Sequence, residues 1–193
     1  MITVEAPSLR FKLTPRIVAA VAHEEGLVLE AYRDSQNVWT WSLGVAATGG
    51  HDVLRYKDNP STIEAALAAA VDFMRAKYLP AVQRAFDGLR LKEHELAGAL
   101  SFHWNTGAIE RASWVKAWRD GDITDARRRY NQWRKPPEII PRRERDAALF
   151  FDGKWPALTV PVYPVRKPSY TPDIRRAQRL DVLPMLEQIM GGV

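Results

Sequence analysis

The feature that most limits the possible folds is a succession of helix-forming segments through the middle of the chain. Six consecutive segments favour helix, and Gly, Pro or Asn separates each from the next. These predicted helices cover 61–78, 80–86, 92–105, 113–120, 123–133 and 141–151. Ser61 and Glu64 form a possible capping box at the start of the first. Another helix precedes the six, with Thr14 as N-cap and Pro15 at its first position.

One stretch has the alternation of a β-strand. Residues 38–43, with the sequence VWTWSL, are rich in β-formers. The preceding residues 34–37 predict a tight turn, in which Asn37 tolerates a left-handed backbone. The chain is therefore expected to be mostly helical, with one small β-hairpin near its N-terminus.

The composition changes near the C-terminus. Residues 156–172 hold five prolines, which predicts an extended linker or a strap on the surface. Thr171 and Pro172 repeat the Thr-Pro helix start, so a final helix is expected from there to about Met190. We predict a single domain over 1–155, followed by an appendage over 156–193 with no assigned role.

Composition excludes several classes of protein. The 193 residues include no cysteine, which excludes a disulfide scaffold, a zinc finger, an iron–sulfur site and a thiol nucleophile. The four histidines lack metal-ligand spacing, so no metal is expected. The longest apolar runs are far shorter than the ~20 residues of a membrane span, so no stable membrane insertion is expected. Residues 1–15 lack the basic start and apolar stretch of a signal peptide.

Positive charge is concentrated in one block of the chain. Residues 111–145 carry 11 basic and 5 acidic side chains, whereas residues 1–110 carry 11 and 13. Aromatic side chains are interleaved with the arginines of this block. Such a face suits an anionic polymer, either nucleic acid or a bacterial cell-wall glycan that carries carboxylates and phosphates. The alternative interpretation is an ordinary solvated helix surface.

Two carboxylates near the hairpin are candidates for acid–base chemistry. On a helix at about 100° per residue, Glu25 falls within the apolar face, Glu24 at its edge and Glu30 opposite. Burial raises the pKa of a carboxyl group, as a general acid requires. Asp34 lies in a polar turn that keeps it ionised, and Thr40 can orient a water. Cleavage of a glycosidic bond needs two carboxyl groups in contrasting environments. A Glu on the apolar face of a helix is, however, more often a structural partner of Arg.

These residues also carry a resemblance to a known family. The string from Glu25 to Asp34, followed by Val-Trp-Thr at 38–40, resembles the active-site signature of phage-type lysozymes. In that family the catalytic triad consists of a glutamate before Gly, an aspartate nine residues on and a threonine six residues beyond that. Both spacings are present here. The stretches 100–107 and 141–155 resemble the family's central and closing helices. The resemblance covers about residues 12–155.

The resemblance implies an α+β lysozyme fold, with a small N-terminal hairpin lobe, a helical lobe and an active-site cleft between the lobes. It implies hydrolysis of the β-1,4 bond between N-acetylmuramic acid and N-acetylglucosamine in peptidoglycan. Glu25 would be the general acid, and Asp34 and Thr40 would hold the attacking water, the inverting arrangement. No cofactor or metal is required. The protein would be a monomer that binds no nucleic acid.

The resemblance also implies substrate-side residues. Asn105 is expected to contact sugar, and Arg142 is the candidate for the arginine near the catalytic glutamate. Trp39 and Trp41 flank Thr40 on opposite faces of the strand, so one is expected in the core, and we assign substrate contact to Trp41. Without a signal peptide, the protein would stay in the host cytoplasm until a membrane lesion releases it, or would be carried in a phage-like particle.

One motif departs from the family pattern. The family usually has Thr-Ile-Gly-Tyr-Gly-His after the hairpin, whereas residues 40–45 here are TWSLGV. The first Gly and the His are lost, so altered subsite detail is expected. Two alternative functions stay open: a non-catalytic glycan-binding or particle-associated structural protein with the same fold, and a nucleic-acid binder that uses the 111–145 block.

Overall fold

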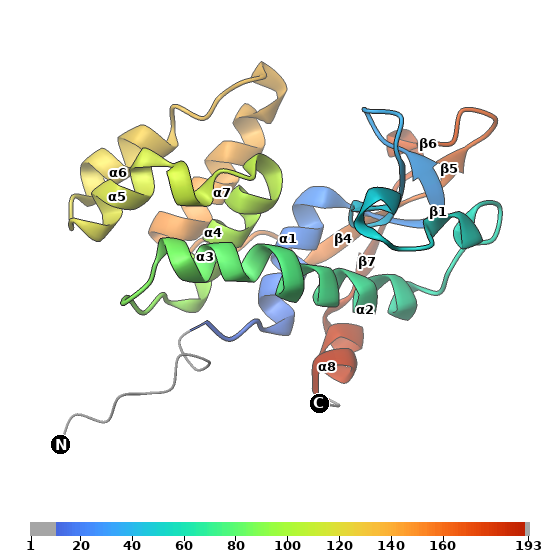
Figure 1. Ribbon diagram of the computed structural model, residues 1–193, viewed down its shortest axis with the longest axis horizontal. Helices are drawn as coiled ribbons and strands as arrows, with labels where there is room; N and C mark the ends of the chain where they lie inside the picture. Colours follow the sequence, from blue (N-terminus) through green and yellow to red (C-terminus); the bar gives the residue numbers. More distant parts are fainter. Residues whose placement is uncertain (1–10, 192–193) are drawn as a thin grey trace. The chain divides into compact units, whose positions relative to one another are not determined.

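The chain folds into two compact units (Figure 1), described here from a computed structural model that covers residues 11–191. Unit 1 comprises the described residues up to Ala20 together with 75–156. Unit 2 comprises residues 21–74 and those from 157 to the C-terminus. The division therefore falls within helix α1 (Pro15–Glu25), after Met74 and after Pro156.

Unit 1 is helical, and its core is aromatic. Its helices are α3 (Leu79–Ala85), α4 (Glu93–Thr106), α5 (Ser113–Arg119), α6 (Ile123–Tyr130) and α7 (Ile140–Asp152). Helix α4 packs against α7, and α5 lies beside α6. The fully buried Trp114 lies at the centre of the core, with its ring centroid 5.3 Å from Phe102, 5.0 Å from Tyr130 and 4.9 Å from Phe150. Offset and edge-on aromatic pairs of this kind add to ordinary apolar burial.

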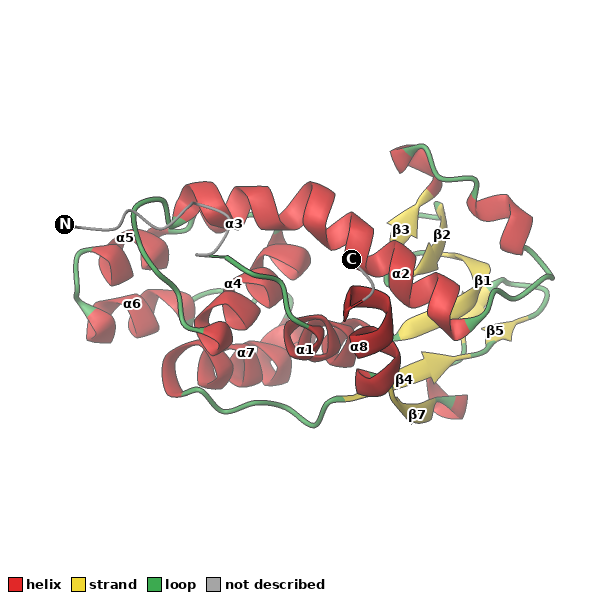
Figure 2. Ribbon diagram, turned by 90° about the horizontal axis from the view of Figure 1, so that it is seen from below, coloured by secondary structure: helices red, strands yellow, loops and turns green. Residues whose placement is uncertain are grey.

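Unit 2 is built on a five-stranded sheet in the order β3-β2-β1-β4-β7 (Figure 2). Its strands are β1 (Leu27–Arg33), β2 (Trp39–Ser42), β3 (Val45–Ala46), β4 (Thr159–Tyr163) and β7 (Gln178–Asp181). β1 and β4 are parallel, and the other neighbours are antiparallel. A separate pair joins β5 (Val165–Arg166) to β6 (Thr171–Pro172), and α2 (Ile63–Phe73) contacts α8 (Leu183–Gly191). Residues 157–193 thus fold as part of this unit.

The start of α1 confirms its sequence signals. Thr14 precedes the helix and its Oγ1 accepts a hydrogen bond from the backbone N–H of Ile17, while Pro15 is the first helical residue. The five predicted helices between 80 and 151 are also present, with ends that differ by at most a few residues. Asn37 has the left-handed backbone expected of it, at φ 60°.

Other local predictions were wrong. Helix α1 stops at Glu25, because Gly26 has a φ of +75° that ends helical geometry, so the helical projection did not apply to Glu30, which lies on β1. Thr62 rather than Ser61 caps α2, and its hydroxyl accepts from Ala65 N–H. The predicted 61–78 helix changes to π-helical geometry over Met74–Tyr78.

The proline-rich stretch is also more ordered than predicted. It contains β4, β5 and β6 rather than an unpaired strap, and Thr171–Pro172 is a strand rather than a helix start. The final helix, α8, begins only at Leu183. The single hairpin is therefore part of a larger sheet. Strands β1 and β7, which both lie outside the proline-rich stretch, supply the hydrogen bonds of β4, and the composition of the stretch carries no sign of them.

Across residues 11–191, no helix is both long and apolar enough to cross a membrane. The residues 1–10, which hold most of the stretch tested for a signal peptide, lie outside the described part of the chain.

The α4–α7 contact generates a stability prediction. A Cβ added at Gly98 on α4 would lie 2.7 Å from Phe150 Cβ and 2.9 Å from its Cα on α7. The backbone of α7 must shift to relieve this, so we expect Gly98→Ala to lower the free energy of unfolding by about 1–3 kcal/mol despite the better helix propensity of alanine. Chemical denaturation measures the change. Gly191→Ala is the control, because among the described residues no atom outside the adjoining helix backbone lies within 4 Å of its new Cβ. Equal effects at the two positions would contradict this account.

Candidate active site

The turn between β1 and β2 is organised by the carboxylate of Asp34. Its Oδ1 accepts hydrogen bonds from the backbone N–H groups of Gln36 at 2.9 Å and Val38 at 2.8 Å. The Asp34 N–H in turn donates to the Val38 carbonyl at 3.0 Å. An aspartate that bonds the backbone two residues on is a recognised turn former. The side chain is partly exposed, so this carboxylate is held in one orientation while solvent still reaches it.

Thr40 brings a hydroxyl to the second oxygen of that carboxylate. Its Oγ1 lies 3.4 Å from Asp34 Oδ2 and 3.2 Å from the Val38 carbonyl oxygen. The residue is 2% exposed and stands opposite Tyr32 in the β1–β2 register. Antiparallel pairing across the short turn therefore places the hydroxyl beside the aspartate. The structure brings this predicted pair together.

Glu25 is the last residue of α1 and is partly exposed. The helical projection predicted that it points among apolar side chains. The structure corrects this: the helix ends here, and the carboxylate is only half-buried.

Tyr32 lies within the electrostatic influence of both carboxylates. Burial raises the pKa of the Tyr32 phenol, and the negative charge of Glu25 and then that of Asp34 raise it further. Glu25 and Asp34 are nine residues apart and belong to different elements. Both carboxylates therefore act electrostatically on one phenol of unit 2.

A residue that the sequence did not indicate also lies beside Glu25. The Tyr163 ring from β4 covers Gly26 so closely that an added Cβ would be 2.1 Å from its Cε2 atom. Burial raises the pKa of Tyr163, Arg179 opposes this effect, and the charge of Glu25 adds to it. His23 donates from Nδ1 to the Thr159 carbonyl at 2.8 Å. This hydrogen bond is a further contact between the end of α1 and β4, in addition to the packing of Tyr163 on Gly26.

Trp41 does not occupy the place predicted for it. It is 3% exposed, its ring stacks on Tyr56 with centroids 4.0 Å apart, and its Nε1 donates to the Leu29 carbonyl and to Ser61 Oγ. The ring is not available to a ligand in this structure, and Trp41 is not part of the site proposed below. Trp39 lies two residues earlier on β2, so strand alternation places it on the same face as Trp41, and the prediction of opposite faces was wrong. Trp39 is partly exposed, with the Arg33 guanidinium 4.2 Å from its ring centroid.

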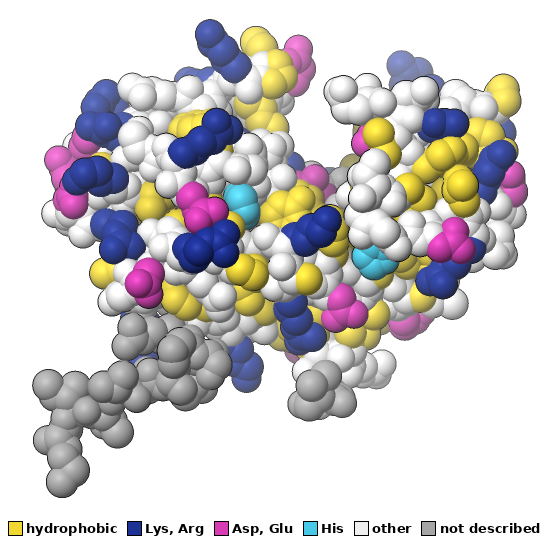
Figure 3. All heavy atoms as spheres, viewed as in Figure 1, with side chains coloured by type: hydrophobic (Ala, Val, Ile, Leu, Met, Phe, Trp, Pro, Cys, Tyr) yellow, Lys and Arg dark blue, Asp and Glu magenta, His cyan; other side chains and the backbone are white. Residues whose placement is uncertain are grey.

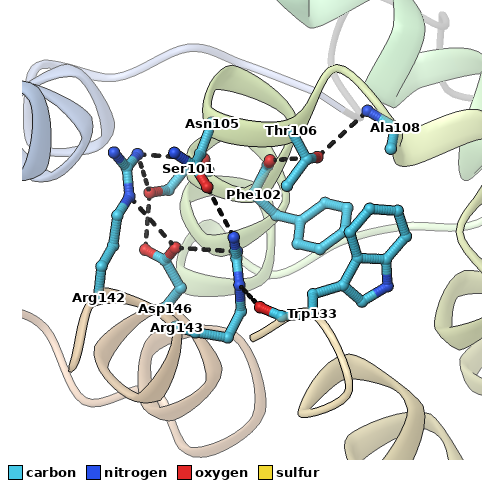
Figure 4. Close-up of polar contacts among 9 residues, drawn as sticks. All are labelled: Ser101, Phe102, Asn105, Thr106, Ala108, Trp133, Arg142, Arg143 and Asp146. Atoms are coloured by element: carbon cyan, nitrogen blue, oxygen red, sulfur yellow. Dashed lines mark hydrogen bonds and ion pairs between the residues drawn. The ribbon is translucent and has the colours of Figure 1, made fainter. Parts of the chain in front are cut away.

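In unit 1, the predicted Arg142 belongs to a buried polar cluster on α4 and α7 (Figure 4). Its Nη2 donates to the carbonyl and hydroxyl oxygens of Ser101, each at 3.4 Å, and its Nε lies 3.6 Å from Asp146 Oδ2. Asp146 also accepts from Ser101 Oγ at 2.7 Å and pairs with Arg143 at 3.3 Å. One carboxylate that is 2% exposed therefore compensates two buried guanidinium groups.

Asn105 lies at the edge of the same cluster, near the end of α4. Its Oδ1 accepts a hydrogen bond from Arg143 Nη2 at 2.7 Å, and Arg143 Nε also donates to the Trp133 carbonyl (Figure 4). The asparagine is exposed, whereas Arg143 is 2% exposed. The buried arginine thus orients the exposed amide, which keeps its N–H donors for other partners.

Much of the positive charge of the 111–145 block is paired within the chain. Arg127 forms an ion pair with Asp152, and Arg128 and Arg129 both pair with Asp125. On the face shown in Figure 3, basic and acidic side chains lie next to one another over α5 and α6. These pairings reduce the charge that the block can offer to an anionic polymer.

Within residues 11–191, no group of three or more His, Asp or Glu side chains is arranged to hold a metal ion.

Comparison with known proteins identifies the family. Residues 22–146 match the phage lysozyme family, which is more than half of the chain and includes Glu25, Asp34 and Thr40. The chain belongs to the phage lysozyme family. It is therefore a glycosidase, a peptidoglycan hydrolase of the muramidase type. No protein with a curated description matches the sequence.

Solved structures share the fold at low identity. An endolysin from Escherichia coli O157:H7 phage FAHEc1 is 21% identical, with a TM-score of 0.63 over 76% of this chain and 97% of that one. A P22 lysozyme mutant is 19% identical, with a TM-score of 0.60 over 72% and 97%. The muramidase domain of SpmX from Asticaccaulis excentricus is 20% identical, with a TM-score of 0.60 over 73% and 98%. These likenesses establish the lysozyme-like α+β fold.

The buried cluster of unit 1 generates a stability prediction. Asp146→Asn keeps the shape of the side chain but removes the carboxylate charge with which both Arg142 and Arg143 pair. Removing one partner of a buried ion pair is strongly destabilising, so we expect a loss of about 3 kcal/mol or more in chemical denaturation. Asp120→Asn is the control, because Asp120 forms an exposed i,i+4 pair with Lys116, and such pairs contribute little. A loss at Asp146 no larger than at Asp120 would show that the cluster is not a stabilising element.

Proposed function

We propose that the protein hydrolyses the β-1,4 bond between N-acetylmuramic acid and N-acetylglucosamine, with inversion at the anomeric carbon. Glu25 is the general acid that protonates the leaving oxygen. Asp34 and Thr40 hold the water that attacks the sugar from the opposite face. Inverting glycosidases divide the work of two carboxyl groups in this way.

The observation that carries the proposal is the arrangement of the three residues in unit 2. The Asp34 carboxylate is fixed through Oδ1 to the turn backbone, and its Oδ2 faces the Thr40 hydroxyl. The charges of Asp34 and Glu25 both reach the Tyr32 phenol. A positioned water next to an oriented carboxylate, with a second carboxyl group nearby, is what general acid–base cleavage requires.

Residues of unit 1 complete the proposal on the substrate side. Asn105 offers an amide that Arg143 orients, and we assign it a hydrogen bond to the sugar. We also assign substrate binding to Arg142, which hydrogen bonds to Ser101 and pairs with Asp146. The chemistry uses only these side chains and water. We further propose that the protein acts as a monomer and reaches the wall through a membrane lesion or within a phage-like particle.

Substitution of the proposed acid tests the function. Glu25→Gln removes the transferable proton with little change in shape, and we expect the lysis rate of permeabilised Gram-negative cells to fall at least about 100-fold. Asp34→Asn and Thr40→Ala should also lower the rate, with circular dichroism used to confirm that the hairpin unit is folded. Turbidity measures lysis.

Glu24→Gln is the matched control, since it makes the same change one residue earlier in α1. The proposal expects Glu24→Gln to lyse cells at close to the wild-type rate. Lysis by the Glu25→Gln variant at the wild-type rate, or the same loss in both glutamate variants, would contradict the role of Glu25. An inactive wild-type protein would contradict the function itself.

A further inference from the structure

A cavity of about 290 Å³ lies within unit 2, on the side of β1 that faces the C-terminal segment. Leu29 and Glu30 of β1 form one wall. Residues 162–165 of β4 and β5, with Arg176 and Gln178, form the other. The volume is near the lower end of that of small-ligand sites. Most of the lining belongs to residues 157–193, which lie beyond the 22–146 match to the phage lysozyme family.

The cavity is next to the proposed general acid. Tyr163 lines it, and the ring of the same residue covers Gly26, which directly follows Glu25. The parallel pairing of Val28 with Tyr163 fixes β4 at this register. A chain attached to a glycan bound at Glu25 therefore has only a short distance to cover, and an extended peptide spans about 3.3 Å per residue.

The cavity lining holds one cationic side chain that can bind an anionic ligand. The acidic residue of the lining, Glu30, forms an ion pair with Lys167, whose Nζ lies 2.7 Å from Glu30 Oε2, and Lys167 also pairs with Asp58 outside the lining. Arg176 is exposed at the opposite wall, and its guanidinium makes no hydrogen bond or ion pair to any described residue. A guanidinium binds carboxylates through paired N–H donors.

The remaining lining suits a peptide. Pro60, Val162, Pro164 and Val165 present apolar surface that small aliphatic side chains can cover, while the exposed Gln178 side chain can both donate and accept hydrogen bonds. Peptidoglycan carries short peptides with free carboxylates on its muramic acid residues, whereas the sugars between them are uncharged.

We propose that this cavity binds the short, carboxylate-bearing peptide attached to the glycan, with Arg176 as its anchor. The inference rests on the proposed function, because it makes the C-terminal segment a recognition element for the same substrate. It predicts that the enzyme distinguishes glycan that carries peptides from glycan that does not.

The test compares two substrates and two arginine variants. Soluble glycan strands are assayed before and after an amidase removes their peptides. We expect Arg176→Ala to raise KM about tenfold on the peptide-bearing strands, as for loss of a charge-assisted hydrogen bond, and to leave KM on the peptide-free strands unchanged. Arg175→Ala is the matched control, because Arg175 is exposed on the same short helix but does not line the cavity.

The outcomes separate the possible explanations. An equal loss in both arginine variants would show a diffuse attraction to polyanions and overturn the proposal. An equal loss on both substrates would indicate a sugar subsite and also overturn it. A direct measurement removes the dependence on catalysis: titration of the Glu25→Gln variant with the isolated peptide, followed by NMR, should show saturable binding that Arg176→Ala weakens and Arg175→Ala does not. Wild-type protein that cleaves neither substrate would contradict the proposed hydrolysis, while this titration would still decide the cavity.

Discussion

The β1–β2 turn depends on the Asp34 carboxylate, and the proposed chemistry depends on that turn. The backbone N–H groups of Gln36 and Val38 both donate to one carboxylate oxygen. This leaves the other oxygen directed at the Thr40 hydroxyl. The residue that closes the hairpin is therefore also the residue proposed to activate water. Because the turn bonds and the proposed catalytic role use the same side chain, the backbone of the turn would also position the proposed water.

Glu25 is positioned by the backbone of the residue that follows it. Gly26 adopts a left-handed backbone that ends α1 immediately after Glu25. The absence of a side chain there lets the Tyr163 ring lie against the chain, where any Cβ would clash. Strand β4 therefore supports the end of α1 through this contact and through His23. The C-terminal segment, outside the family match, is in this way part of the unit that carries all three proposed catalytic residues.

Features that depend on neighbouring residues were predictable from the sequence, and features that depend on distant ones were not. The Thr14 cap and the 34–40 turn with its hydroxyl arise from spacings of a few residues, and both are present. The parallel partner of β4 is β1, more than 130 residues away, so the proline content of β4 outweighed its β-forming valines in a local interpretation. Trp41 faces the interior because Tyr56 and Ser61, from later segments, pack on it. The alternation of the strand places its two tryptophans, which are two residues apart, on the same face, but it does not show which of them a later segment covers.

The central claim is that Asp34 and Thr40 direct a water, rather than a side-chain oxygen, at the anomeric carbon. The most direct measurement is the anomeric form of the newly released reducing ends, followed by ¹H NMR before mutarotation. Attack by a water opposite the leaving group converts the β-linked substrate into the α-anomer as the first product. The account predicts the α-anomer. First appearance of the β-anomer would show retention through a second displacement, and would contradict the role given to the Asp34–Thr40 pair.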